Sequence, residues 1–315
     1  MTRYLGLDTS NYTTSVAALE AETGALWQVK QLLPVKEGEL GLRQSDAVFH
    51  HVRQLPELVE RLVSECGSLF SVSAVGASDR PSQAEGSYMP CFLSGEGAAR
   101  QLAAVLGVPM YRFSHQQGHV MAALYGAEAL ELRERPFLAF HVSGGTTDAL
   151  LVRPDTEAVI RCERVAGSLD LKAGQLIDRV GGMLGLAFPA GPALEQLAQP
   201  IEGKTPRPSM EGTSCHLSGV ENQCRKLLTN GASPQEVARF CLLSVCGAVE
   251  TMTECLLQQY GDLPVVYAGG VMSNGYLREV LSRRFGGRFA PPAYSADNAA
   301  GIAVLTCLKA GGVLP

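Results

Sequence analysis

Two histidines, His115 and His119, have the spacing of a metal-binding pair. Side chains four residues apart project from one face of a helix, so two imidazoles placed in this way can share a metal ion. In the His-Glu-x-x-His pattern of zinc proteases, the residue after the first histidine is a glutamate that acts as general base. Here that residue is Gln116, which cannot accept a proton at neutral pH. The spacing argues against metalloprotease chemistry, and it leaves open both metal binding and a pair of unligated histidines.

A second chemical feature is a glycine turn after the apolar run Phe137–Val142, where Ser143, Gly144 and Gly145 begin a Ser-Gly-Gly-Thr-Thr-Asp segment. Paired glycines can adopt backbone angles closed to other residues, so that successive N–H groups point into one concavity. The hydroxyl groups add short hydrogen-bond donors, and Asp148 could hold a cation or a water. These are the components of a phosphate site, although a hairpin turn without a ligand is the simpler explanation of the motif alone.

Two further polar turns interrupt apolar runs. Asp8, Thr9, Ser10 and Asn11 lie in the first, within the hairpin-like segment 4–19. The second follows the strand-like segment 264–268, where Gly269-Gly270 and Asn274 precede a helix-like segment from about residue 276. A strand, paired glycines and a helix place backbone N–H groups at a helix N-terminus, where ligand phosphates or ribose can bind. The two hairpins, half a chain apart, indicate an internal duplication.

In this order, the three turns resemble the nucleotide-binding fold of actin, hexokinase and Hsp70. The resemblance implies an α/β protein of two lobes, with duplicated βββαβα-type domains and an interlobe nucleotide cleft. We expect residues 1–111 plus the C-terminal helix 299–315 to form the N-terminal lobe, and residues 112–298 to form the C-terminal lobe. A length of 315 residues fits two domains of ordinary size.

Helical periodicity places several candidate side chains. Apolar residues at helix-like spacing predict a helix over 44–69 that restarts or kinks at Pro56. We expect His50 and His51, just before that proline, to be exposed to solvent or to cap the helix. Asp178 lies on an amphipathic helix before a Pro-Ala-Gly-Pro turn, either as a salt-bridged surface residue or as a group aimed at a ligand hydroxyl. Ser233 and Pro234 begin a central core helix that runs to about residue 260. Asp297 precedes the last helix, either as its N-cap or as a third metal ligand.

Composition limits the possible partners. The formal net charge is −5, so this chain lacks the basic surface of a protein that grips nucleic acid alone. If RNA is the substrate, we expect a partner to supply part of that surface.

Nine cysteines without CxxC spacing fit buried thiols in a reducing compartment. We find no apolar run near 18 residues and no signal-peptide hydrophobic region, which predicts a cytoplasmic protein without a membrane span.

Five ordered motifs resemble the TsaD/Gcp family, the catalytic subunits of tRNA threonylcarbamoyladenosine synthesis, once labelled O-sialoglycoprotein endopeptidases. The motifs are His115-x-x-x-His119, Val142-Ser143-Gly144-Gly145, the Asp178 helix with Pro189-Ala190-Gly191-Pro192, Gly269-Gly270-Val271-x-x-Asn274, and Asp297-Asn298-Ala299-Ala300. The similarity runs over nearly the whole chain.

By this resemblance, His115, His119 and Asp297 would hold one divalent metal per chain, iron or zinc. Threonylcarbamoyl-AMP, or ATP as the nucleotide ligand, would bind at His141, Val142, Ser143, Gly144, Gly145, Asp178, Gly191 and Asn274. The family transfers the threonylcarbamoyl group to the exocyclic amine of the tRNA adenosine beside the anticodon. The resemblance also implies partner subunits resembling TsaB and TsaE, and a homo- or heterodimer.

The sequence departs from the family pattern in several places, which indicates a divergent paralogue. An acidic pair in the first hairpin is replaced by Tyr12 and Thr13, and a lysine after the Ser-Gly pair at 218–219 is replaced by Glu221. A non-catalytic or differently specific nucleotide-binding paralogue, such as a related carbamoyl-type transferase or a regulatory subunit, is therefore the alternative. A kinase or ATPase would leave the histidines without a role, and an endopeptidase lacks its base.

Overall fold

The computed structural model describes residues 1–10, 12–34, 42–68, 71–295 and 299–315. The chain forms two compact units. The first unit comprises Met1–Arg135, Arg153–Glu163 and Ala293–Pro315, and the second comprises Pro136–Val152 and Arg164–Pro292. Residues 112–135 and 153–163, which the sequence analysis placed in the C-terminal lobe, thus belong to the first unit.

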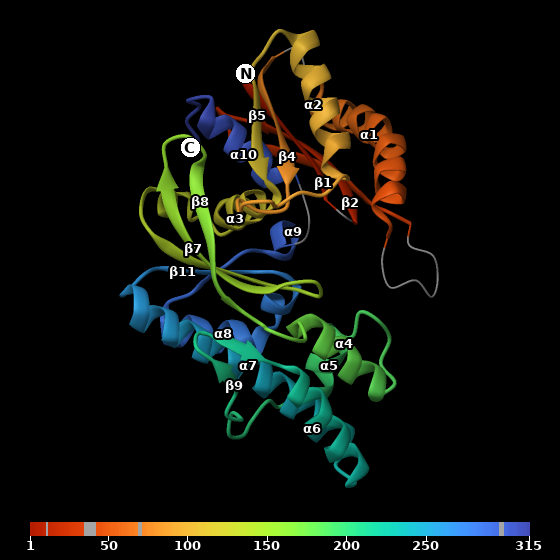
Figure 1. Ribbon diagram of the computed structural model, residues 1–315, viewed down its shortest axis with the longest axis vertical. Helices are drawn as coiled ribbons and strands as arrows, with labels where there is room; N and C mark the ends of the chain where they lie inside the picture. The colour runs from red at the N-terminus through yellow and green to blue at the C-terminus, as the bar shows by residue number, and fades with distance from the viewer. Residues whose placement is uncertain (11, 35–41, 69–70, 296–298) are drawn as a thin grey trace. The chain divides into compact units, whose positions relative to one another are not determined.

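The first sheet has the strand order β3-β2-β1-β4-β5 (Figure 1). Its strands are β1 (Arg3–Ser10), β2 (Thr13–Glu20), β3 (Leu26–Leu32), β4 (Val72–Arg80) and β5 (Met110–Ser114). Strands β1, β2 and β3 form an antiparallel meander, whereas β4 and β5 are added in parallel to β1. The hairpin register pairs Asp8 with Ser15 and Ser10 with Thr13, so Asp8, Thr9 and Ser10, which the sequence predicted in a turn, are residues of strand β1.

The second sheet, read from its other end, has the order β8-β7-β6-β11-β12. Its strands are β6 (Phe137–Val142), β7 (Thr147–Asp155), β8 (Val159–Gly167), β11 (Val265–Ala268) and β12 (Arg288–Phe289), and a separate small hairpin joins β9 (Ser209–Glu211) to β10 (Ser214–His216). Strand β6 is antiparallel to β7 and parallel to β11, as β1 is to β2 and β4. The repeated order confirms the predicted internal duplication.

Helices cover both faces of the first sheet. They are α1 (Gln44–Cys66), α2 (Phe92–Leu106), α3 (His115–Gly126) and α10 (Ala300–Lys309), together with the short elements η1 (Leu130–Glu134) and α9 (Pro292–Ser295). Leu5 and Leu7 of β1 pack into the core beneath α1 and α2, whereas Gly6, between them, faces the backbone of α10. Because successive strand residues point to opposite faces, α10 lies on the other side of this sheet (Figure 1). Helix α1 continues through Pro56, so the helix does not end and restart there.

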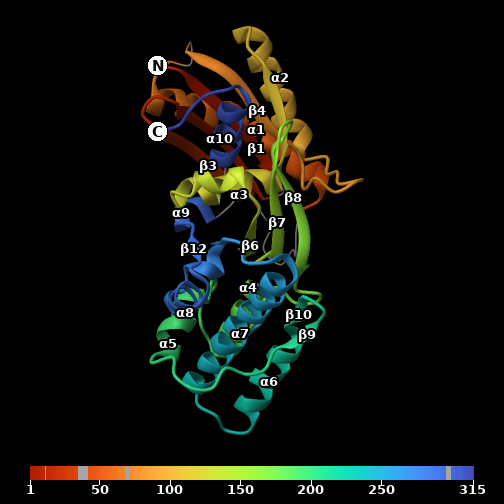
Figure 2. The ribbon, with the colours of Figure 1, turned by 90° about the vertical axis from the view of Figure 1, so that its left-hand side faces the viewer.

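In the second unit, α7 is the central helix. The helices are α4 (Ala173–Met183), α5 (Gly191–Ala198), α6 (Ser218–Thr229), α7 (Pro234–Tyr260) and α8 (Gly275–Phe285), with the short η2 (Gly270–Ser273) before α8. Helix α7 packs against α4, α5 and α6 (Figure 2). Its start is the predicted one, because Ser233 accepts the Glu236 N–H in a capping box, and it ends before Gly261.

The same helix is long and apolar enough to cross a membrane by length and composition alone. Its most apolar 18-residue window has a mean hydropathy of 1.6, so the expectation that no apolar run approaches 18 residues was wrong. Of that window, 72% is buried inside the protein. Such burial is typical of the core helix that the sequence predicts.

Close backbone contact between α3 and α10 gives a stability prediction. A Cβ atom on Gly301 would overlap the Gly118 carbonyl group. We expect Gly301→Ala to lower the free energy of unfolding by about 1–3 kcal/mol, because backbone on both sides resists the overpacking. The control is Gly97→Ala in α2, where a Cβ meets nothing within 4 Å; it should raise stability by about 0.4–1 kcal/mol. Urea unfolding of both variants measures the difference, and equal effects would contradict this packing.

Candidate functional site

In the second unit, the glycine turn after β6 is closed by Ser143 and Thr146. The Ser143 N–H donates to the Thr146 carbonyl at 2.8 Å, and the Thr146 N–H donates to Ser143 Oγ at 3.2 Å. Gly144 and Gly145 are exposed, and a Cβ on either would meet nothing within 4 Å. Neither glycine has a positive φ, so the expectation of unusual backbone angles was wrong. The hydrogen bonds of Ser143 close the turn without them, and the space around both glycines is open.

This turn lies against the N-terminus of α4. The Gly174 N–H donates to the Ser143 carbonyl at 3.1 Å, and the Ala173 N–H donates to Thr147 Oγ1 at 2.9 Å. A Cβ on Gly174 would lie 2.6 Å from the backbone nitrogen of Gly144, so the approach requires glycine. The positive end of the α4 dipole therefore lies beside the turn, where it favours an anion.

Asp178, on α4, connects this helix to α5. Its Oδ1 accepts the Ala190 N–H at 2.8 Å, which fixes the turn immediately before Gly191, the first residue of α5. The side chain is half-buried and makes no ion pair in the described part of the chain. Of the two alternatives from the sequence, the salt bridge is not found among the described residues, and one carboxylate oxygen is bonded to the backbone; a ligand contact through the other oxygen stays a prediction.

Asn274 caps α8, and the residues on either side of it contact α5 and the end of β6, just before the glycine turn. The Asn274 Oδ1 accepts the Leu277 N–H at 3.0 Å, and the Gly275 N–H donates to Glu195 of α5 at 2.7 Å. On the other side of η2, Gly269 has a φ of 103°, and a Cβ there would lie 2.6 Å from the Val142 carbonyl carbon. Gly269 is thus the glycine that needs a positive φ and close backbone approach.

Together these contacts form a continuous ring. It runs from the turn to α4, then to α5, α8 and η2, and back to β6. The predicted substrate residues of this unit lie on it or beside it: His141, Val142, Ser143, Gly144, Gly145, Asp178, Gly191 and Asn274. Of the three helices that this ring connects, α4 is the one whose N-terminus contacts the exposed glycine turn directly.

In the first unit, the histidine pair lies as its spacing predicts. Ser114 caps α3 in a capping box with Gln117, and His115 is the first residue of the helix. The rings of His115 and His119 are 4.3 Å apart between centroids. His115 Nδ1 lies 2.9 Å from Oδ1 of Asp8, which is fully buried on β1.

The two imidazoles fit a pair of nitrogen ligands to one divalent metal, because they lie side by side on one helix face. The third predicted ligand, Asp297, is outside the described residues, as is Asn11 of the first hairpin. Within the described ranges, no group of three or more His, Cys, Asp or Glu side chains is arranged to hold a metal ion.

The polar residues of the first hairpin are turned into the protein. Thr9 Oγ1 donates to the Cys91 carbonyl at 3.0 Å and accepts the Gly95 N–H at 3.1 Å, so it connects β1 to α2. Asp8 and Thr9 are fully buried and Ser10 nearly so. The two hairpins therefore differ, because this one uses its side chains internally whereas the turn after β6 is open.

Sequence reasoning missed His51, which it expected to be solvated or capping. The ring is fully buried and its Nδ1 lies 2.8 Å from Thr14 Oγ1. Burial lowers the pKa of His51 to about 4, although the nearby charge of Asp8 opposes the shift. A buried histidine could not be recognised from the sequence, because the helix face that meets the sheet is set by tertiary packing.

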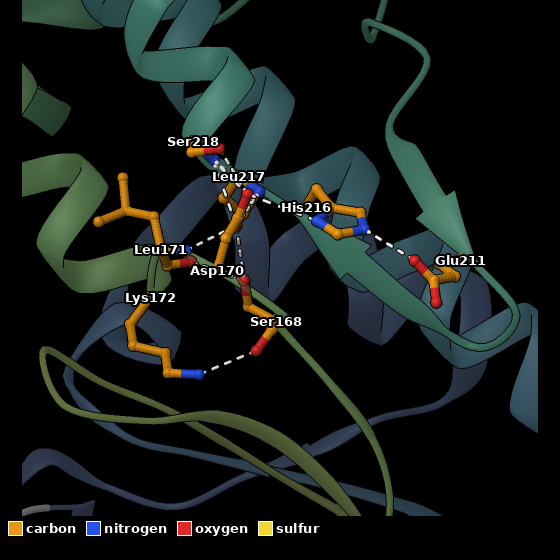
Figure 3. Close-up of polar contacts among 8 residues, drawn as sticks. All are labelled: Ser168, Asp170, Leu171, Lys172, Glu211, His216, Leu217 and Ser218. Carbon is orange, nitrogen blue, oxygen red and sulfur yellow. Dashed lines mark hydrogen bonds and ion pairs between the residues drawn. The ribbon is translucent and has the colours of Figure 1, made fainter.

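Asp170 ties the segment before α4 to the start of α6 (Figure 3). Its Oδ1 accepts the N–H groups of Leu171 at 2.6 Å and Leu217 at 2.7 Å, and its Oδ2 accepts from the Ser218 hydroxyl. Burial alone would raise its pKa, but the Ser218 hydroxyl and these N–H groups outweigh it and hold the pKa of Asp170 well below its usual range. His216 Nδ1 lies 3.5 Å from Oδ2. This carboxylate is an N-terminal cap for α6.

Two further acidic side chains of the second unit are also paired within the protein. Asp148, a candidate cation holder, accepts from Arg164 Nε at 2.7 Å. Glu221, which reverses a charge, pairs with Arg179 at 3.0 Å and Arg225 at 3.1 Å.

A cavity of about 190 Å³ lies near the start of α6. Its walls include Arg207, His216, Gln223 and Phe240, and none of the predicted site residues.

Two five-stranded sheets with the same order of strands define the class of proteins to which actin, hexokinase and Hsp70 belong. Solved structures similar to this chain include a ROK hexokinase from Thermus thermophilus, with a TM-score of 0.51 and 17% identity, covering 98% of this chain and 99% of that one. Component A of the (R)-2-hydroxyglutaryl-CoA dehydratase of Acidaminococcus fermentans has a TM-score of 0.55 and 16% identity, covering 99% and 100%. At these identities the likeness shows the fold alone, and it confirms the predicted fold class.

Sequence comparison defines the family. The TsaD family model, described as tRNA N6-adenosine threonylcarbamoyltransferase, matches residues 38–304. A protein of that name from Bacillus licheniformis is 28% identical over 318 residues, covering 95% of this chain and 89% of its own length. The chain therefore belongs to the TsaD family.

The Asp170 contacts predict a pH dependence of stability. Because its folded pKa is depressed, the contribution of the charge is fully present above the unfolded pKa of about 3.9 and is lost as pH falls from there through the folded pKa. We expect Asp170→Asn to unfold at lower urea concentration than the parent protein at pH 7, with a difference that shrinks below about pH 4. Asp262→Asn, on an exposed loop, is the control and should show no such difference. A gap of constant size at all pH values would contradict the assignment.

Proposed function

We propose that this protein transfers a threonylcarbamoyl group from threonylcarbamoyl-AMP to the exocyclic amine of the tRNA adenosine beside the anticodon, with a divalent metal as cofactor. Membership of the TsaD family indicates a threonylcarbamoyltransferase. The ring of contacts that includes the glycine turn is the structural observation that supports threonylcarbamoyl-AMP as the donor. All the residues predicted to bind the adenylate lie on this ring or beside it, within one unit.

The residues in this ring of contacts have the chemistry to bind an adenylate. The backbone N–H groups of Gly144 and Gly145, beside the positive end of α4, would bind the phosphate. The second oxygen of Asp178, which makes no hydrogen bond in the described residues, would orient a ribose hydroxyl. In the transfer, the adenosine amine attacks the carbamoyl carbonyl, the new C–N bond forms, the C–O bond to the phosphate breaks, and AMP leaves with the phosphate oxygen while the amine loses a proton. Holding the donor in position would supply much of the rate.

In the first unit, His115 and His119 would hold the metal, with Asp297 as a third ligand. When bound, a metal of this kind polarises the acyl carbonyl and offsets the negative charge that develops on its oxygen. With a net charge of −5, the chain would bind tRNA with partner subunits that supply basic surface, in the cytoplasm where tRNA is modified.

The alternative is a nucleotide-binding paralogue without this activity. It is favoured by Tyr12 and Thr13, which replace the acidic pair of the family, and by Glu221, whose reversed charge is neutralised by arginines. Incubation of the metal-loaded protein with threonylcarbamoyl-AMP and tRNA, with and without partner subunits, separates the two. Mass spectrometry should detect threonylcarbamoyladenosine in the digested tRNA. Adenylate binding without any modified nucleoside would establish the paralogue instead.

A valine at the glycine turn tests the adenylate site. Since a Cβ on Gly144 meets nothing within 4 Å, Gly144→Val should fold with nearly parental stability, yet its branched side chain would occupy the proposed phosphate position. We expect at least about a tenfold loss of threonylcarbamoyl-AMP affinity by calorimetry, equivalent to 1.4 kcal/mol. Gly182→Val, at an exposed position of α4 with equally open surroundings, is the control and should bind normally. Unchanged affinity in Gly144→Val would place the nucleotide elsewhere.

Metal analysis tests the histidine pair. We expect about one iron or zinc per chain in the purified protein, and loss of most of it in His115→Ala and in His119→Ala. Each variant removes one of the two nitrogen ligands, and water in its place would bind the metal much more weakly. His216→Ala, in the second unit, should keep its metal. Parental metal content in both α3 variants would exclude this pair as ligands.

A further inference from the structure

Asp8, on the central strand of the first sheet, makes a direct polar contact to the histidine pair. Its Oδ1 lies 2.9 Å from His115 Nδ1 and also accepts a hydrogen bond from Ser78 Oγ. Asp8 and Ser78 are fully buried, and only 19% of the His115 side chain is exposed. A carboxylate shared in this way lies in a water-excluded position, where a hydrogen bond to a charged group is strong.

The backbone fixes the carboxylate before any ligand binds. Strand β1 pairs with β2 on one side and with β4 on the other, and the register aligns Leu7 with Ala77. Asp8 and Ser78 are the next residues on two parallel neighbouring strands, so their side chains lie next to each other. Aspartate has only two rotatable side-chain bonds, and Ser78 holds one of its oxygens. The position of Oδ1 is therefore set by the sheet and not by a loop.

In a neutral imidazole whose Nδ1–H donates to a carboxylate, the second nitrogen, Nε2, carries no proton. The hydrogen bond at Nδ1 thus determines which nitrogen carries the lone pair and how the ring is turned. Carboxylates that contact the far nitrogen of a metal-binding histidine orient the ring and raise its basicity, and their loss typically lowers metal affinity about 10–100-fold.

We propose that Asp8 is the positioning residue of the histidine pair: assisted by Ser78, it holds His115 as the Nδ1–H tautomer, with Nε2 presented for a divalent metal. The geometry of Asp8, His115 and Ser78 carries this inference, and the metal part of it rests on the proposed function. The first hairpin then contributes to the site through the buried Asp8, whereas the sequence suggested a hairpin that meets phosphate directly. Its role is to orient a ligand of the metal.

Nitrogen-15 NMR of the protein without metal tests the tautomer independently of metal binding and activity. The chain has six histidines, so the His115 signals are identified by their absence in His115→Ala. At about pH 8 we expect the Nδ1–H pattern for His115 in the parent protein. In Asp8→Ala we expect a shift toward the Nε2–H form, because the acceptor is gone. An Nε2–H or doubly protonated ring in the parent protein would overturn the proposal.

Metal affinity gives the second measurement, with zinc titrated against a competing chelator. Asp8→Asn keeps an acceptor oxygen of the same size but removes the charge, so it should fold and bind zinc about tenfold more weakly. Ser78→Ala should show a smaller loss in the same direction. Asp79→Asn, the next residue on β4 and the partner of Arg80, is the matched control and should bind zinc normally.

The outcomes separate this inference from the proposed function. If His115→Ala weakens zinc binding strongly and Asp8→Asn does not, His115 is a ligand and the positioning role is wrong. If His115→Ala itself leaves zinc binding unchanged, the proposed metal site fails, whereas the tautomer measurement still decides whether Asp8 orients the ring. Circular dichroism confirms that each variant is folded.

Discussion

The parallel pairing of β6 with β11 is the constraint on which the candidate nucleotide site depends. Its register sets His141 opposite Ala268, so both strands end at the same edge of the sheet and the turns that follow them meet. The meeting is close enough that position 269 must be glycine with a positive φ, because any Cβ there would collide with Val142. Helix α4 begins beside the first of these turns, where the Gly174 N–H donates to the Ser143 carbonyl, and α8 follows the second turn along the chain. The site is thus a consequence of strand order more than of any single side chain.

The same pairing occurs in the first unit but has a different chemical result. Strands β1 and β4 correspond to β6 and β11 in their sheet, and their ends bring Asp8 next to Ser78. There the polar groups are buried and satisfy one another, with His115 as the third member. One duplicated architecture therefore supplies an exposed glycine turn in one unit and a buried carboxylate in the other. A duplicated fold can diverge in this way because the strand order is held by the core, whereas the residues at the strand ends are not.

One replaced family residue has clear structural partners here. Glu221, which stands where the family has a lysine, forms ion pairs with two arginines. Two further polar residues are occupied inside the second unit: Thr147 accepts the first N–H of α4 through its hydroxyl, and Asp170 holds the start of α6. Such residues stabilise the second unit whatever group it transfers. The divergence of this chain has therefore kept the framework of the site while changing polar groups around it.

The sequence alone was sufficient for features that depend on local chemistry. The helix start at Ser233 follows from its capping box, and the closeness of His115 and His119 follows from helical spacing. The order of the glycine turns also indicated the fold class and the duplication. These are properties of short segments, and short segments obey backbone geometry and hydrogen-bond chemistry that can be recognised from residue types.

Contacts between distant segments were decided only by the tertiary structure. The tether from Asp178 to Ala190, the burial of His51 and the contact of Asp8 with His115 depend on which faces pack together. Residues 8 and 115 are separated by most of the first unit, and nothing in the local sequence of either one specifies the other. Their distance is set by β-sheet register and helix packing, because the burial of apolar faces, summed over the whole unit, determines where each polar side chain lies.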